Sequence, residues 1–357
     1  MSLQFITGGS GAGKSEYLSR LVCEESVRRP HDNFIVVVPE QYTMETQKKL
    51  VHMHSRKGIL NIDVVSFERL AYKVFEELGG GNRPVLDDTG KNLIVRRVLE
   101  KEKKKLDYFG SSIEKTGFVS ELKSVISELL QYGITPQQLG EIGENVKEKQ
   151  QLSAKLKDIR LVYKEFMAFL STNYITSEEI LDVLCGLVEK SKLIAGSEII
   201  FDGFTGFTPI QYKLMRLLLV YSKGIKISVT IDKKERPTGH EGWNNLFFMS
   251  KEMMNRLIAI CEEEGINVDD TVCVDRDINY RYEGAKDLAY LERNLFRYKG
   301  GVYTGTPENI RIYEGSNPKE ELQYIVSEIL QLTRKEGFRY RDIAVVTADL
   351  ETYGKDA

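Results

Sequence analysis

A glycine-rich segment near the N-terminus carries the strongest chemical signal in this sequence. It reads Gly8, Gly9, Ser10, Gly11, Ala12, Gly13, Lys14, Ser15. This is the G-x-x-x-x-G-K-[ST] spacing of a phosphate-binding loop, or P-loop, in which glycines let successive backbone N–H groups approach phosphate oxygens. The following helix N-terminus adds a positive dipole, Lys14 would reach the terminal phosphates, and the Ser15 hydroxyl would ligate Mg²⁺. The segment therefore predicts a site for a nucleoside triphosphate with magnesium.

A second metal-side acid is expected at Asp202, which directly follows the predicted strand Glu198–Phe201. P-loop proteins place such an acid near the magnesium ion. The alternative role for Asp202 is a turn residue at the end of a strand. The next residue is Gly203, where motor helicases usually carry a glutamate that polarises the attacking water. We therefore expect slow hydrolysis even if nucleotide binds tightly.

Two short blocks combine aromatic and polar side chains where predicted strands end, Pro39–Thr43 and Ser66–Tyr72. Open α/β sheets bind ligands at this end of their strands. Aromatic faces beside amide, hydroxyl and guanidinium groups suit single-stranded nucleic acid. Structural roles are the alternative, with Phe67 in the core, Thr43 as a helix cap and Arg69 in a surface ion pair.

A parallel α/β sheet is needed to bring these residues together, and the sequence predicts one. We expect strands at 3–7, 34–38, 62–65, 198–201 and 225–231, and helices at 14–28, 43–54 and 67–78. Continuous apolar runs are typical of parallel strands buried on both faces, and their alternation with helices indicates the α/β class. Thr208, Pro209 and Gln211 predict a capped helix start.

The region between residues 86 and 192 changes to a helical pattern. Apolar residues at three- and four-residue spacing predict helices at 88–104, 113–132, 135–142 and 150–173. Because strands resume afterwards, we interpret this region as a helical insertion into the sheet.

The remaining C-terminal sequence predicts two more helices and two more strands. The helices are expected at 244–264 and, capped by Asn317, up to residue 334, and the strands at 309–313 and 343–347. The sequence ends shortly after a strand that needs a partner, so we expect it to be part of a longer protein.

Composition narrows the class of protein. The 357 residues include 50 Lys+Arg and 53 Asp+Glu, for a net charge of -3, which argues against a surface that grips nucleic acid everywhere but leaves room for a local basic groove. The four cysteines form no C-x-x-C pair, so a zinc site or iron–sulfur cluster built by this chain alone is not expected.

No apolar run approaches the ~20 residues of a membrane span, and the N-terminus does not resemble a signal peptide. A cytoplasmic protein without membrane contact is predicted.

Four motifs together resemble the AddB family, which belongs to the bacterial AddAB helicase–nuclease that processes DNA double-strand breaks. They are residues 5–15, Val38–Thr43 (V-P-E-Q-Y-T), Val65–Ala71 (V-S-F-E-R-L-A) and Phe201–Gln211 (F-D-G-F-T-G-F-T-P-I-Q). The P-loop is generic, whereas the other three are more diagnostic. The motifs run in order through most of the chain, although the helical stretch contributes little.

The resemblance implies a superfamily 1 helicase-like architecture. Residues 1–85 and 193–300 would form a RecA-like P-loop domain (1A), residues 86–192 its helical 1B-type insertion, and residues 301–357 the start of a second RecA-like domain. It also implies binding of ATP and Mg²⁺ with little or no motor activity, in a heterodimer with an AddA-type subunit that supplies translocation. The family's C-terminal nuclease, with its iron–sulfur cluster, lies outside this sequence, so the chain is not expected to cut DNA.

The resemblance further implies contact with single-stranded and duplex-end DNA, and recognition of the recombination hotspot Chi. The residues it places at that site are Gln41, Thr43, Phe67, Arg69 and Tyr72, with Phe204 or Phe207 nearby. Tyr72 stands where many members have Trp, which keeps a stacking face but leaves the recognised sequence open.

Two other functions fit the P-loop. One is a kinase or phosphotransferase acting on a small molecule, which would consume ATP only with its acceptor. The other is a purely architectural pseudo-helicase, in which nucleotide only stabilises the subunit. The long helical insertion and the aromatic–arginine blocks favour the DNA-repair subunit over the kinase.

Overall fold

The computed structural model of this chain describes residues 1–79, 84–115, 117–146, 149–176, 179–235, 242–297 and 301–354. The chain divides into two compact units, Met1–Arg281 and Tyr282–Ala357. None of the helices within these described ranges combines the length and apolar character needed to cross a bilayer.

The first unit alternates strands and helices. It begins with β1 (Ser2–Gly8), α1 (Lys14–Arg28), β2 (Asn33–Val37), a 3-10 helix (Glu40–Tyr42), α2 (Thr43–Met53), β3 (Ile62–Val65) and α3 (Phe67–Leu78). A mainly helical region follows, with β4 (Val85–Leu86), α4 (Asp88–Glu102), a 3-10 helix (Lys103–Lys105), α5 (Phe118–Gln131), α6 (Pro136–Asn145), α7 (Gln150–Asn173), β5 (Ile175–Thr176), α8 (Ile180–Cys185), a 3-10 helix (Val188–Lys190) and α9 (Lys192–Ala195). The unit continues with β6 (Ser197–Phe201), α10 (Pro209–Tyr221), β7 (Gly224–Thr230), α11 (Phe248–Glu264), β8 (Asn267–Val268), β9 (Val272–Cys273) and a 3-10 helix (Tyr280–Tyr282), whose last residue is the first of the second unit.

The main sheet is parallel, which confirms the α/β class. Its strand order is β3-β2-β6-β7-β1-β8, with β9 also pairing with β1. The register pairs Gly8 with Thr230 and Val37 with Phe201. The carboxyl ends of β1, β7, β6 and β2 therefore lie along one edge, and this arrangement is consistent with a RecA-like fold.

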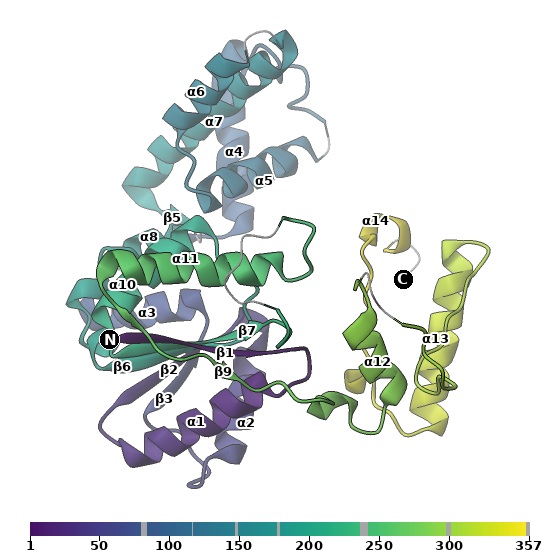
Figure 1. Ribbon diagram of the computed structural model, residues 1–357. Coiled ribbons are helices and arrows are strands. Elements are labelled where there is room, and N and C mark those ends of the chain that lie inside the picture. Colours follow the sequence, from purple (N-terminus) through teal and green to yellow (C-terminus); the bar gives the residue numbers. More distant parts are fainter. Residues whose placement is uncertain are drawn as a thin grey trace. The chain divides into compact units, whose positions relative to one another are not determined.

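Helices cover both faces of the sheet (Figure 1). Because successive strand residues point to opposite faces, neighbours such as Phe5 and Ile6 enter two separate cores. Helices α3, α8, α10 and α11 pack on the face that contains Phe5, whereas α1 and α2 pack on the face that contains Ile6. Strand β6 is buried along its whole length, as a parallel strand covered by two helical layers must be.

Side-chain caps fix where two helices begin at the carboxyl edge. Ser66 accepts a hydrogen bond from the backbone N–H of Arg69 at the start of α3. Thr208 and Gln211 form a reciprocal capping box at the start of α10, with Pro209 as its first residue, which confirms the predicted start.

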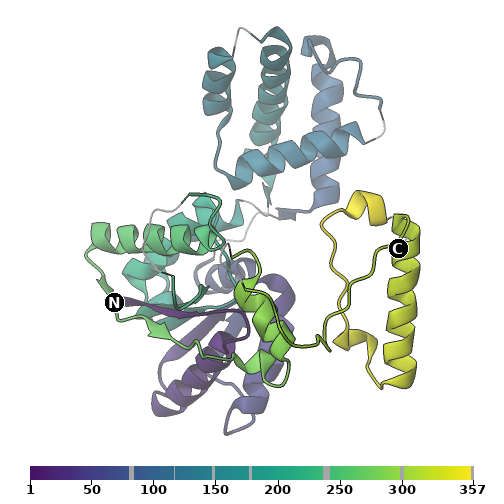
Figure 2. The ribbon, with the colours of Figure 1, turned by 45° about the vertical axis from the view of Figure 1, so that its right-hand side comes forward.

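The region between α3 and α8 is helical, as predicted, apart from the two-residue strands β4 and β5, which pair with each other. Helices α4, α5 and α7 surround their own apolar core (Figures 1 and 2). The buried Asp158 carboxylate accepts backbone N–H groups from Asp107, Tyr108 and Phe109, which fixes the loop after α4. Helix α5 begins at Phe118 rather than at residue 113, because Gly117, with φ of 86°, forms its N-cap.

The second unit contains α12 (Lys286–Asn294), α13 (Pro318–Lys335), a 3-10 helix (Tyr340–Asp342) and α14 (Leu350–Tyr353). The N-cap predicted at Asn317 is confirmed, because its side chain accepts the N–H of Glu320 at 3.0 Å. The Asp287 carboxylate of α12 accepts the backbone N–H groups of Glu308 and Asn309. These hydrogen bonds, the one from Asn309 most of all, lower the pKa of this carboxyl to about 2.

Besides the start of α5, the predictions of two strands and of one further helix start are wrong. Residues 309–313 and 343–347 are not strands, because an extended apolar segment becomes a strand only when a neighbour pairs with its backbone. No such pairing occurs within the described residues of the second unit. Helix α11 begins at Phe248 rather than at residue 244, because turns occupy the residues before it.

Candidate functional site

The glycine-rich loop, residues 8–15, joins β1 to α1. Gly11 and Gly13 have φ of 71° and 95°, in the left-handed region that glycine adopts without steric cost. A Cβ on Gly8 would lie 3.0 Å from the Cβ of Ala12, so any larger residue there would have to displace a neighbour. Gly13 caps α1 without a side-chain hydrogen bond. The loop therefore brings backbone N–H groups and a helix N-terminus to the carboxyl edge, an arrangement that favours an anion.

A cavity of about 670 Å³ opens at this loop, within the size range of small-molecule and cofactor sites. It brings together Lys14, Ser15 and Asp202, the three side chains that the sequence analysis expects beside a nucleotide and its magnesium ion. Ser228 of β7 and Arg281 line it as well. The cavity thus joins the first βα turn to the ends of β6 and β7.

Lys14 lies folded back on its own loop. Its Nζ donates hydrogen bonds of 2.9 Å to the carbonyl oxygens of Gly8 and Gly9. Glu16, in the first turn of α1, is paired with Lys49, and the hydrogen bond from Lys49 lowers the pKa of the Glu16 carboxyl. The positive N-terminus of α1 attracts anions, and the pairing with Lys49 offsets the negative charge of Glu16 that would oppose this attraction.

Asp202 is fixed at the end of β6 by neighbours on both sides. Its backbone N–H donates to the carbonyl of Val37 at 3.0 Å, which continues the β2–β6 ladder by one residue. Its Oδ1 accepts a hydrogen bond of 2.5 Å from the Ser228 hydroxyl. The chain then turns at Gly203, where φ is 83°.

Residues 279–281, just before the second unit, also contact the glycine-rich loop, and the sequence analysis did not predict this. The N–H of Arg281 donates to the carbonyl of Gly11 at 3.3 Å, and Nδ2 of Asn279 donates to that of Ser10 at 3.3 Å. The Tyr280 ring lies 3.3 Å from where a Cβ on Gly13 would be. Some 270 residues separate this segment from the loop, so no local spacing could have revealed the contact.

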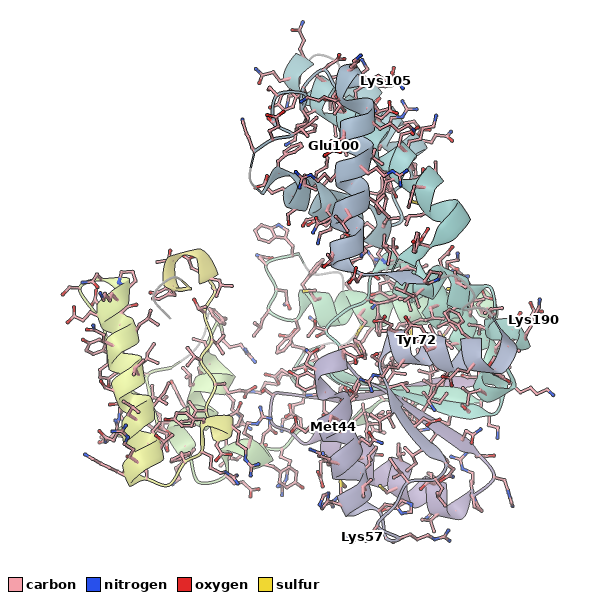
Figure 3. The ribbon with its side chains drawn as sticks, turned by 180° about the vertical axis from the view of Figure 1, so that it is seen from behind. Met44, Lys57, Tyr72, Glu100, Lys105 and Lys190 are labelled. Atoms are coloured by element: carbon pink, nitrogen blue, oxygen red, sulfur yellow. The ribbon has the colours of Figure 1, made fainter. Side chains whose placement is uncertain are left out.

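The two aromatic–polar blocks lie side by side, because β2 pairs with β3 in a register that matches Val37 with Val65. Gln41, Arg69 and Tyr72 are exposed there, and Figure 3 shows Tyr72 on α3 and Met44 near the start of α2. Nη2 of Arg69 lies 2.8 Å from Oε1 of Glu40, with both side chains more than half exposed. This surface ion pair is weak, so the guanidinium can exchange Glu40 for another anion.

The structure corrects the roles expected for Phe67 and Thr43. Phe67 is only 7% exposed and packs against the rings of Phe201, Phe204 and Phe207 at 5.4–6.0 Å. Thr43 is 5% exposed, and its hydroxyl donates to the carbonyl of Glu40. Phe67 therefore takes its structural alternative in the core. Thr43 is the first residue of α2 rather than its cap, which is Tyr42. Burial leaves neither side chain open to DNA.

Phe204 and Phe207 are partly buried and pack on this aromatic cluster from the loop between β6 and α10. Phe204 lines the main cavity. Phe207 lines a second cavity of about 350 Å³ that also contacts Tyr132, Tyr212 and Arg256. Of the predicted DNA contacts, the structure therefore leaves Gln41, Arg69, Tyr72 and the edges of these two rings available.

Fold and site define the class: a parallel-sheet α/β protein with a glycine-rich loop at the first βα turn, consistent with a RecA-like core. The chain belongs to the AddB family, because the family model described as "ADDB, N-terminal" matches residues 5–292.

Relatives from several bacteria are named as the B-type subunit of an ATP-dependent helicase/deoxyribonuclease. The chain is 43% identical to the protein of Lachnoclostridium phytofermentans, 36% to that of Caldanaerobacter subterraneus and 34% to that of Clostridioides difficile. Each of these alignments covers 99% of the present chain. It spans only 30–31% of the length of these relatives. The similarity therefore covers the sheet and the helical region but not most of each relative.

Proposed function

We propose that this chain is the helicase-like part of a DNA double-strand-break repair subunit, which holds ATP and Mg²⁺ with little or no motor activity and contacts single-stranded DNA. One observation carries the proposal: the cavity at the carboxyl edge gathers Lys14, Ser15 and Asp202 in a chain of the AddB family. The names of the relatives, which include both a helicase and a deoxyribonuclease function, support the repair role.

In the nucleotide site, the loop N–H groups and the α1 N-terminus would hold the phosphates. Lys14 would release the carbonyls of Gly8 and Gly9 and turn to the terminal phosphates. The Ser15 hydroxyl and the Asp202 carboxylate are the oxygen ligands that Mg²⁺ prefers, and bound Mg²⁺ would neutralise phosphate charge. Arg281 supplies a further cation at the cavity wall.

Slow or absent hydrolysis follows from what comes after Asp202. Gly203 occupies the position at which a carboxylate could activate water, and it has no side chain. The turn at its φ of 83° is also strained for any residue with a Cβ. The nucleotide would therefore be held rather than turned over.

The DNA-contacting surface in this proposal consists of Gln41, Arg69 and Tyr72, with Phe204 and Phe207 beside it. Recognition of the Chi hotspot as single-stranded DNA passes would use these amide, guanidinium and aromatic groups. Arg69 has the clearest role, because its present partner Glu40 is exposed and easily replaced.

Arg69→Ala should weaken binding of single-stranded DNA by about 1–3 kcal/mol if the guanidinium contacts a base edge. The fold should be unaffected, because the side chain is 57% exposed. The measurement is fluorescence anisotropy with short labelled DNA at fixed salt, since salt alone changes such affinities strongly.

Lys73→Ala is the matched control, because it removes a positive charge from the same helix, where Lys73 pairs with Asp63. It should change DNA binding by much less. Equal losses in the two variants, independent of DNA sequence, would show that helix α3 contributes only diffuse positive charge.

The protein would act with an AddA-type partner on duplex ends in the cytoplasm, with AddA supplying translocation. Any iron–sulfur cluster would belong to a nuclease region outside these 357 residues. The alternative function, a small-molecule kinase, is less well supported, because the family model matches residues 5–292. Transfer of phosphate from ATP to a small acceptor without DNA would support the kinase instead.

A further inference from the structure

Ser228 lines the proposed nucleotide site, although no motif in the sequence points to it. It belongs to β7, next to the P-loop strand, where it pairs in register with Ile6. Its side chain is 4% exposed and lines the main cavity. A buried hydroxyl requires hydrogen-bond partners, and both of its partners belong to the turn after β6.

The Ser228 hydroxyl is both a hydrogen-bond donor and a hydrogen-bond acceptor. It donates to Oδ1 of Asp202 at 2.5 Å and accepts the N–H of Gly203 at 3.3 Å. The first is a charge-assisted hydrogen bond, stronger than a bond between neutral groups. Together they fix the carboxylate and the next peptide as one rigid turn.

We propose that Ser228 is the positioning residue that orients Asp202 as a single-oxygen ligand for nucleotide-bound Mg²⁺. With Oδ1 held by the hydroxyl, Oδ2 is left to face the metal or its water. Ligands that support a metal site commonly receive such hydrogen bonds from a second group, which fixes their direction. This inference rests on the proposed function, because it needs the nucleotide and its magnesium.

A purely structural role for Ser228 makes a different prediction. If the hydroxyl only stabilised the turn, its loss would affect nucleotide binding equally with and without magnesium. If it competed with the metal for Asp202, its loss would strengthen the response to magnesium. Positioning alone predicts a selective loss of that response.

The test compares wild type, Ser228→Ala and Ser222→Ala. Ser222 is a buried serine just before β7 whose hydroxyl makes no hydrogen bond within the described residues, so it controls for loss of a buried hydroxyl. The affinity for a slowly hydrolysed ATP analogue is measured in EDTA and across a Mg²⁺ titration.

We expect Ser228→Ala to bind the analogue like wild type in EDTA but to lose about tenfold of the gain in affinity that Mg²⁺ brings, the effect of one hydrogen bond to a charged group. Ser222→Ala should match wild type, and Ser228→Thr, which keeps the hydroxyl, should keep the Mg²⁺ response. In an Asp202→Asn background, Ser228→Ala should add no further loss, because the two residues act as a unit.

An unchanged or increased Mg²⁺ response in Ser228→Ala, or an equal loss in EDTA, would overturn the proposal. So would full additivity with Asp202→Asn. A wild-type chain that bound no nucleotide under either condition would instead overturn the proposed function, so the two failures can be told apart.

Discussion

Replacing Lys14 with alanine should lower the affinity for ATP with Mg²⁺ by about 100-fold, the loss expected when a charged hydrogen-bond donor to phosphate is removed. Lys14 lines the cavity, and its Nζ already lies within 2.9 Å of two loop carbonyls. A short movement would transfer it to phosphate oxygens. Calorimetric titration of ATP in the presence of Mg²⁺ measures the change.

The fold should survive this substitution, because Lys14 is only partly buried and lines the cavity rather than the apolar core. Circular dichroism and thermal unfolding should match wild type. Lys48→Ala provides the control, since Lys48 is an exposed lysine of α2 that does not line the cavity. Retention of wild-type affinity by Lys14→Ala would contradict the phosphate-cradle role of residues 8–15.

Replacing Phe67 with alanine should lower the free energy of unfolding by about 3–5 kcal/mol, the usual cost of deleting a buried aromatic ring. The ring is 7% exposed and contacts three other phenylalanines, so its removal leaves a cavity and breaks several ring–ring contacts. Urea denaturation of the purified chain measures the change.

Tyr72→Ala is the matched comparison on the same helix. Tyr72 is 38% exposed, so its loss should cost about 1 kcal/mol of stability while removing a stacking face from the DNA-contacting surface. A Phe67→Ala variant with wild-type stability and impaired DNA binding would show that Phe67 contacts DNA directly and that the core assignment is wrong.

Local sequence was sufficient for the elements whose signals are contiguous. Helices α1, α3 and α7 begin and end at the predicted residues, because the spacing of their apolar residues is a signal carried by neighbouring positions. Strands β4, β5, β8 and β9 were missed, because each has two residues and therefore too few positions to show a period. The extended segments at 309–313 and 343–347 show the opposite error, since a strand also requires a partner that its own residues do not specify.

The candidate site divides in the same way. Lys14 and Ser15 belong to one contiguous motif, and Asp202 follows an apolar strand, so their meeting could be predicted. Ser228 and Arg281 could not be found, because their contacts with Asp202 and Gly11 depend on strand register and on a distant chain segment. Phe67 remained ambiguous in the sequence, since an aromatic residue at a helix start suits either a core or a stacking surface until the neighbouring loop is placed.

The most direct test of a held, unhydrolysed nucleotide is to incubate the chain with radiolabelled ATP, Mg²⁺ and single-stranded DNA, remove free nucleotide, and identify by chromatography what stays bound. The proposed function predicts about one nucleotide retained per chain, recovered as ATP even after prolonged incubation with DNA. Recovery of ADP with DNA-dependent release of phosphate would contradict it by revealing a working motor, and the absence of any retained nucleotide would contradict the site itself.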